Sequence, residues 1–264
     1  HFSLDDEAEL NKILMVTNGA KDLCLHLRLS IPNNFAKIKI SNKFGASKKK
    51  APELLKIMKK FSSKIGISFH PGSQCMNPEA YKIAMKISSD VIEKSGVDIN
   101  FLNVGGGFPV KSPDLNSLPL INYFRVIKNE LNKIKTRNKI KLLSEPGRAL
   151  VSECMSLIVR VELRKGCKLY INDGIYGSLR DLSNQKINHT VRLRNRKIKK
   201  KKKIAFNFYG PTCDSNDFIK GPFYLPDEIS SGDLIEIFQM GSYSFTMKSD
   251  FNGYFYKPKF FTEK

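Results

Sequence analysis

Three consecutive glycines, Gly105, Gly106 and Gly107, follow an apolar stretch that begins at Phe101. The stretch predicts a buried strand, and the glycines begin where that strand ends. Because glycine has no Cβ, backbone N–H groups in such a segment can approach an anion closely. A tight turn after a strand explains the same pattern. The triplet alone therefore leaves both interpretations open.

Polar residues follow two other predicted strands in the same way. His70 ends the predicted strand 65–70 and begins the sequence HPGSQC, and Glu145 follows the predicted strand 140–144 and begins EPGR. A third polar segment, GPTCDSND, covers residues 210–217. Parallel α/β barrels place their active sites at the ends of strands. Taken singly, Glu145 could be a surface acid in a turn and His70 a structural histidine.

The motifs GGGFP, EPGRALV, YGPTCDSND and MGSYS occur together in this one chain. In order and spacing they resemble the fold-type III pyridoxal-phosphate decarboxylases, most nearly the ornithine/lysine decarboxylase branch of the ornithine/diaminopimelate/arginine decarboxylase family. The resemblance runs from His1 to about Lys257. It implies a pyridoxal 5′-phosphate-dependent lyase that decarboxylates a basic diamino acid, ornithine or possibly lysine, to a diamine in polyamine biosynthesis.

The resemblance also implies roles for individual residues. Glu145 would keep the pyridine nitrogen protonated, so that the ring can accept the electrons left by CO₂, and His70 would lie against the ring. Arg148 would bind the phosphate through its forked guanidinium. The implied cofactor-binding residues are Arg28, His70, Ser73, Gly105, Gly106, Gly107, Glu145, Pro146, Gly147, Arg148 and Tyr243. The implied catalytic residues are Cys213, Glu145 and His70, and we expect no metal site.

In the family, the loop that matches residues 210–217 enters the partner subunit's active site, which implies a homodimer with shared active sites. Cys213 would protonate the carbanion carbon, and Asp214 would bind the distal amine of the substrate. Lys43 and Asp217 would form an ion pair across the dimer. Eukaryotic ornithine decarboxylases have a second acidic substrate residue after the YGS motif, where this chain has only Asp181 at a different spacing. The size of the substrate therefore stays open.

The family's Schiff-base lysine lies on the first barrel strand in a pattern like AVKAN, and this sequence has no such pattern. About four strand–helix units are visible where a barrel has eight. We therefore expect an N-terminally truncated chain that is inactive as a decarboxylase by itself. The alternatives are a catalytically inactive binding or regulatory relative, and a diaminopimelate decarboxylase. The retained Glu145, Cys213 and Asp214 favour the enzyme, since an inactive relative is free to lose them.

Strands and helices alternate over residues 1–150, where we expect the C-terminal half of a pyridoxal-phosphate-binding α/β barrel of the TIM type. Ser3 or Asp5 is expected to cap the first helix. Short β segments dominate residues 151–264, where we expect an antiparallel β-sandwich or barrel domain. The expected helices are 51–62, 78–95 and 118–135, and the expected strands are 22–30, 65–70, 140–144, 157–164, 168–172, 203–209, 233–239 and 253–257.

The formal net charge is +20, but lysines are spread along the whole chain of 264 residues. Only 192–203 is a concentrated basic run, and it lacks the interleaved aromatics that single-strand nucleic-acid binding uses. An exposed hairpin loop between two strands is the favoured interpretation, and a nucleic-acid partner is not expected. No run of 18 apolar residues and no signal peptide are visible, so we expect no membrane partner. Five scattered cysteines fit a cytoplasmic location.

Overall fold

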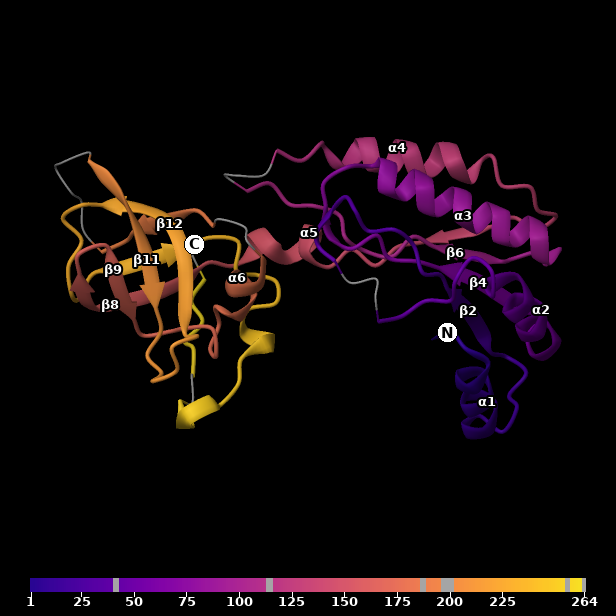
Figure 1. Cartoon of the computed structure of the whole chain (residues 1–264), viewed down its shortest axis with the longest axis horizontal. Helices are drawn as coiled ribbons and strands as arrows, with labels where there is room; N and C mark the ends of the chain where they lie inside the picture. Colours follow the sequence, from indigo (N-terminus) through magenta and orange to yellow (C-terminus); the bar gives the residue numbers. More distant parts are fainter. Residues whose placement is uncertain (40–42, 113–115, 186–188, 196–201, 255–256, 263–264) are drawn as a thin grey trace. The chain divides into compact units, whose positions relative to one another are not determined.

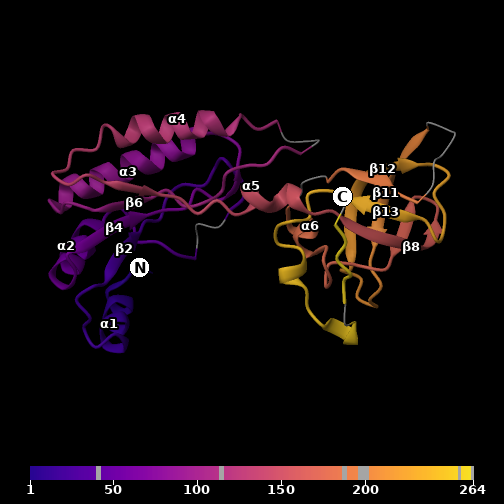
Figure 2. The same ribbon diagram turned by 180° about the vertical axis from the view of Figure 1, so that it is seen from behind.

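A computed structural model describes residues 1–39, 43–112, 116–185, 189–195, 202–254 and 257–262. The chain forms two compact units, shown from opposite sides in Figures 1 and 2. The first unit comprises His1–Val110 and Ser117–Ala149, and the second comprises Lys111–Asn116 and Leu150–Lys264.

The first unit is built on one sheet of five strands in which neighbours follow chain order and every pair is parallel. The strands are β1 (Phe2–Leu4), β2 (Cys24–Arg28), β4 (Lys64–Ser68), β6 (Phe101–Asn103) and β7 (Lys141–Leu143). The connecting helices are α1 (Glu7–Val16), α2 (Ala51–Phe61), α3 (Glu79–Ser95) and α4 (Leu120–Leu131). Parallel strands in chain order with helical connections are the repeating unit of an α/β barrel.

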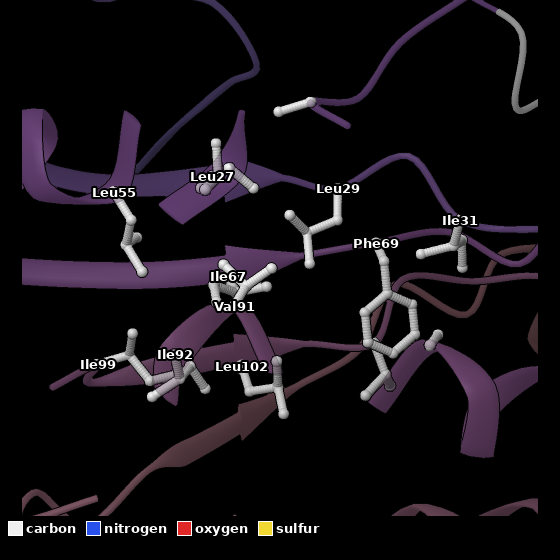
Figure 3. Close-up of a cluster of buried hydrophobic side chains, with 14 of the residues drawn as sticks. Leu27, Leu29, Ile31, Leu55, Ile67, Phe69, Val91, Ile92, Ile99 and Leu102 are labelled. Atoms are coloured by element: carbon white, nitrogen blue, oxygen red, sulfur yellow. The ribbon is translucent and has the colours of Figure 1, made fainter. Parts of the chain in front are cut away.

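Apolar and polar side chains of the central strands lie on opposite faces of the sheet. Leu27, Ile67 and Leu102 lie on the helix-facing side of the sheet and join a buried cluster with side chains of α2 and α3 (Figure 3). Successive strand residues point to opposite faces. His26 and Arg28 therefore lie on the other face from Leu27. The polar residues that follow β4, β6 and β7 meet at the carboxyl edge of the sheet.

Some local features differ from the sequence predictions. The first helix is capped by Asp6, whose carboxylate accepts from Ala8 N at 2.9 Å. The prediction that Ser3 or Asp5 caps this helix was wrong. Ser3 lies in β1, and the Asp5 carboxylate accepts a hydrogen bond from Gly45 N instead. α4 is shorter than predicted. A two-stranded sheet of β3 (Ala36–Ile38) and β5 (Ser73–Cys75) was not predicted, because three-residue strands carry too little pattern.

The second unit contains a six-stranded sheet in the order β10-β13-β8-β9-β11-β12. Its neighbours are antiparallel except β9 and β11, which are parallel, so the sheet is mixed rather than purely antiparallel as predicted. A second buried core includes Val159, Val161, Phe206 and Phe208. The elements are β8 (Leu157–Lys165), β9 (Lys168–Ile171), β10 (Val191–Leu193), β11 (Lys203–Tyr209), β12 (Phe218–Pro226), β13 (Leu234–Ile237), α5 (Arg148–Val151), which begins in the first unit, η1 (Ser152–Cys154), α6 (Arg180–Gln185), η2 (Phe245–Met247) and η3 (Phe251–Gly253).

Two predictions for this unit were wrong. The basic run does not join a hairpin, because β10 pairs with β13 whereas β11 pairs with β9 and β12. Arg192 lies in β10 and is 2.6 Å from Glu236, and residues 196–201 fall outside the described chain. The strand predicted at 253–257 begins in a 3₁₀ turn, and residues 255–256 are likewise not described. Among the described residues, no helix is long and apolar enough to cross a membrane.

Candidate active site

The glycine triplet follows β6 in a conformation that needs glycine. Gly105 and Gly107 have φ values of +67° and +86°. A Cβ on Gly105 would lie 2.2 Å from Phe69 O, and one on Gly107 would lie 2.1 Å from Gly72 O. Left-handed backbone torsions and close backbone contacts both exclude a side chain at these two positions. The chain therefore passes tightly over the end of β4.

The carbonyl groups of the triplet are held by neighbouring elements. The Tyr81 hydroxyl on α3 donates to Gly106 O at 2.7 Å, and Cys75 N donates to Gly107 O at 2.8 Å. Within the described part of the chain, no group accepts from the N–H of Gly106 or of Gly107. The two amides are therefore open donors on a fixed backbone, which is the requirement for an anion-binding loop.

Glu145 is positioned against the triplet by backbone and side-chain bonds. Its N–H donates to Gly105 O at 2.8 Å. Its Oε1 accepts from Nδ2 of Asn103 at 2.7 Å, and Asn103 Oδ1 in turn accepts from Gly105 N at 2.9 Å. The carboxylate is exposed. One amide side chain thus fixes both the start of the glycine loop and the orientation of the acid.

His70 follows β4 and faces the same loop. Its Nδ1 accepts from Gly72 N at 3.1 Å, so the neutral ring carries its proton on Nε2. A Cβ on Gly106 would lie 3.2 Å from that Nε2. Burial, and secondly the positive charge of Arg28, lower the pKa of His70 below 6.5, while Glu145 acts in the opposite direction. The imidazole is therefore neutral near pH 7.

The other predicted residues of the first unit surround this edge. Arg28 is the last residue of β2, and its guanidinium lies 5.7 Å from the centre of the Phe44 ring. Ser73 begins β5 and is half-buried, whereas Arg148 begins the short helix α5 and is buried. Pro146 and Gly147 connect Glu145 to that helix. Lys43 is exposed, with its Nζ 5.1 Å from the Phe44 ring.

In the second unit, the polar loop 210–217 joins β11 to β12 and is organised by Asp217. This residue is only 3% exposed. Its Oδ1 accepts from Ile175 N at 2.9 Å, and its Oδ2 accepts from Thr212 N at 3.0 Å and from the Thr212 hydroxyl at 2.8 Å. A Cβ on either Gly174 or Gly210 would lie 2.1 Å from Asp217 Oδ1. The predicted ion pair with Lys43 concerns a dimer and stays a prediction.

Asp214 and Cys213 are presented on the outside of that loop. The Tyr176 hydroxyl donates to Asp214 Oδ2 in a short hydrogen bond, and Asn216 N donates to Oδ1 at 2.9 Å. The Asn216 amide, and then the Tyr176 hydroxyl, lower the pKa of Asp214 below its ordinary value. Cys213 is exposed, and its Sγ is 3.1 Å from Nδ2 of Asn252. The loop therefore presents an ionised carboxylate beside an accessible thiol.

Tyr243 lies in a loop of the second unit that is tied to the segment after α5. Met240 N donates to Met155 O at 2.9 Å, and Gly241 N donates to Ser152 O at 3.0 Å. Tyr243 has a φ of +54°, which is uncommon for a residue other than glycine, and it is 47% exposed. The loop thus holds an exposed phenol on a constrained backbone.

Sequence reasoning missed the residues that hold the site in place. Tyr81 and Asn103 bind the glycine loop directly, and Gln74 exchanges hydrogen bonds of 2.8 and 3.2 Å with the backbone of Val110 just beyond it. The sequence pattern at these positions gave little indication of such a role. Asn103 is a polar residue at the end of an apolar strand, and Tyr81 lies among the apolar positions of α3, where it is indistinguishable from a core residue.

Comparison with known proteins places this geometry in a family. Residues 1–152, more than half of the chain, match the family described as "Pyridoxal-dependent decarboxylase, pyridoxal binding domain". The chain belongs to this family, whose cofactor is pyridoxal 5′-phosphate, and its first unit is part of the family's α/β barrel. The sequence predictions of the family, of an α/β barrel fold for the first unit and of the cofactor are thereby confirmed.

Proteins similar to this chain are named as decarboxylases and as an antizyme inhibitor. The lysine/ornithine decarboxylase of Selenomonas ruminantium is 29% identical over 265 residues, which are 97% of this chain and 65% of that protein. Antizyme inhibitor 2 of Xenopus laevis is 29% identical over 278 residues, which are 97% of this chain and 60% of that protein. The crystal structure of the arginine decarboxylase of Paramecium bursaria Chlorella virus is 27% identical, with a TM-score of 0.81 over 95% of this chain and 68% of that one. The chain thus spans about two thirds or less of the curated relatives' length.

The residues at the carboxyl edge fit pyridoxal phosphate. Two open amides on a rigid glycine loop suit its phosphate. A neutral imidazole beside that loop offers an uncharged face to an aromatic ring, and an oriented carboxylate can pair with a protonated pyridine nitrogen. All of these groups belong to the first unit.

Proposed function

We propose that the protein carrying this chain decarboxylates a basic diamino acid, ornithine or lysine, to the corresponding diamine, as a step of polyamine biosynthesis. The choice of substrate rests on the side chain of Asp214. Its carboxylate is part-exposed, accepts hydrogen bonds from the Tyr176 hydroxyl and from two N–H groups of Asn216, and is kept ionised by these donors. An ionised carboxylate pairs with the distal ammonium group of ornithine or lysine and repels the distal carboxylate of diaminopimelate.

The first unit supplies the chemistry common to the family. Bound pyridoxal phosphate acts as an electron sink for the pair left behind when the carboxyl group departs. The open amides of Gly106 and Gly107 hold the phosphate, and Arg148 and Ser73 contribute charge and a hydroxyl. Glu145, oriented by Asn103, keeps the pyridine nitrogen protonated. His70, a neutral imidazole beside the glycine loop, would lie against one face of the ring.

Cys213 and Asp214 act on the substrate in a neighbouring subunit. We propose a cytoplasmic homodimer in which the exposed thiol returns a proton to the carbon that has lost CO₂. Residues 1–150 form the cofactor-binding part, and residues 151–264 form the domain that carries this loop. Tyr243 adds a phenol to the phosphate site, and Lys43 pairs with Asp217 across the dimer.

The test is CO₂ release from ornithine, lysine, arginine and diaminopimelate, measured with the protein that carries this chain. We expect activity on ornithine or lysine. Asp214→Asn should raise KM by about tenfold to a hundredfold, as for the loss of a hydrogen bond to a charged group, and should leave kcat much less affected. Ser215→Ala, one residue away in the same loop, is the matched control and should leave both constants unchanged. Preference for diaminopimelate would overturn the assignment of substrate.

A binding protein without catalysis is the second candidate, because a relative named antizyme inhibitor 2 is as similar to this chain as the decarboxylase of Selenomonas ruminantium. Absence of CO₂ release from all four amino acids, in a protein that is folded and supplied with pyridoxal phosphate, would favour this candidate.

A further inference from the structure

Three side chains with metal-binding atoms meet at the amino end of the sheet, away from the glycine loop. His1 directly precedes β1, Cys24 begins β2, and His26 lies two residues further along β2. The register pairs Phe2 with Leu25 and Ser3 with His26. His1, Cys24 and His26 therefore lie on one face of two neighbouring strands, opposite the helix-facing core.

The distances between their ligand atoms are close to those of a tetrahedral metal site. His1 Nδ1 is 2.8 Å from His26 Nε2, and Cys24 Sγ is 3.6 Å from the same Nε2. All three atoms lie within 4.8 Å of one another. Tetrahedral zinc separates two nitrogen ligands by about 3.3 Å and a nitrogen from a sulfur by about 3.6 Å. Binding a cation would lengthen the separation of the two histidine nitrogens by about 0.5 Å and bring His1 Nδ1 to about 3.6 Å from Cys24 Sγ.

The surroundings hold the central ligand in place. Cys24 and His26 are buried, whereas His1 is exposed. A Cβ on Gly66 would lie 2.4 Å from His26 Nδ1, so the missing side chain makes room for the ring. The His26 ring also lies 5.1 Å from the His1 ring and 5.7 Å from the Phe101 ring, centre to centre.

Hydrogen bonding alone cannot satisfy this arrangement. His26 Nε2 has a single lone pair or a single proton, yet both His1 Nδ1 and Cys24 Sγ approach it. A cation between the three atoms would satisfy all of them at once.

We propose that His1, Cys24 and His26 bind a zinc-type divalent cation, with water as the fourth ligand. Imidazole and thiolate together favour zinc over harder cations such as magnesium and calcium. The site joins β1 to β2 at the amino ends of the strands, the face of an α/β barrel whose residues serve stability rather than catalysis. The proposal is independent of the proposed decarboxylase activity, because it concerns other residues and another ligand.

The sequence had pointed to no metal site. A Cys-x-His pair with a histidine 23 residues upstream has no recognised zinc spacing, and only the pairing of β1 with β2 brings the three residues together.

The test uses Co²⁺ as a spectroscopic probe on protein purified without a polyhistidine tag. We expect one Co²⁺ per chain, a sulfur-to-cobalt charge-transfer band, tetrahedral d–d bands, and displacement of Co²⁺ by Zn²⁺. Cys24→Ser should lose the charge-transfer band. Cys75→Ser, which changes the other buried cysteine, should keep it.

His1→Ala provides a second variant that leaves the fold intact, because His1 is exposed. It should weaken Co²⁺ binding by about tenfold or more. The proposal is wrong if the wild-type protein shows no charge-transfer band or if the band survives in Cys24→Ser. It is equally wrong if Cys24→Ser does not fold and His1→Ala binds Co²⁺ as tightly as the wild type.

Discussion

The hydroxyl of Tyr81 donates a hydrogen bond to the carbonyl oxygen of Gly106 at 2.7 Å, which joins the buried face of α3 to the middle of the glycine loop. Tyr81 is fully buried. Because the Gly106 carbonyl is held from the helix side, the hydrogen bond fixes the orientation of the peptide group between Gly106 and Gly107.

We expect Tyr81→Phe to weaken binding of pyridoxine 5′-phosphate, a cofactor analogue that forms no Schiff base. Tyr123→Phe is a matched control, because Tyr123 is equally buried and its hydroxyl donates to Cys75 O at 2.8 Å. Both variants should lose about 1 kcal/mol of unfolding free energy, since each leaves one buried carbonyl without its donor. Titration of the analogue and urea unfolding separate the two effects. Equal weakening of binding in both variants would contradict a specific role for Tyr81.

Stability should depend on pH through His70. Its pKa in the folded chain lies below 6.5, so the unfolded chain takes up the proton more readily. The free energy of unfolding therefore falls as pH drops through 6.5 toward the folded-state pKa. His70→Asn keeps an acceptor for Gly72 N but does not titrate. Between about pH 7.5 and about pH 5.5, urea unfolding should show a larger loss in the wild type than in this variant. A larger loss in His70→Asn would mean that the sign is wrong.

Asp217→Asn should loosen the loop that carries Cys213 and Asp214. Its two oxygens accept three hydrogen bonds, so an amide NH₂ at either position would face a donor. We expect a loss of about 1–3 kcal/mol in unfolding free energy. Asp227→Asn, which removes one partner of a part-exposed ion pair with Arg164, should cost less than about 1 kcal/mol. Similar losses in the two variants would show that Asp217 does not organise the loop.

Shared active sites can be tested by mixing two inactive variants of the protein that carries this chain, Cys213→Ala and Glu145→Ala. If Cys213 serves the partner's site, each mixed dimer has one site with both defects and one intact site. Random reassortment makes half of the dimers mixed, so activity should recover to about a quarter of wild type for a symmetric dimer. A mixture that stays inactive after verified subunit exchange would place Cys213 and Glu145 in the same subunit's site.

The sequence by itself determined the family, the cofactor and the alternation of strands and helices in the first unit. Those features depend on local patterns: apolar periodicity predicts strands and helices, and glycine, proline and polar motifs follow the predicted strands. It also pointed to Glu145 and His70, because both residues follow such strands. In the second unit the same patterns did not predict the strands β10 and β12. They also did not indicate that β9 and β11 are parallel.

Only the tertiary structure decided which residues hold these groups in place. Asn103 meets Glu145 across 42 positions of sequence, Tyr81 meets Gly106 from a helix, and His1 meets Cys24 and His26 across a strand pair. Such contacts depend on strand register and on which face of a helix is buried. Both are set by packing of the whole unit, because a shift of one residue in a strand turns every side chain to the opposite face.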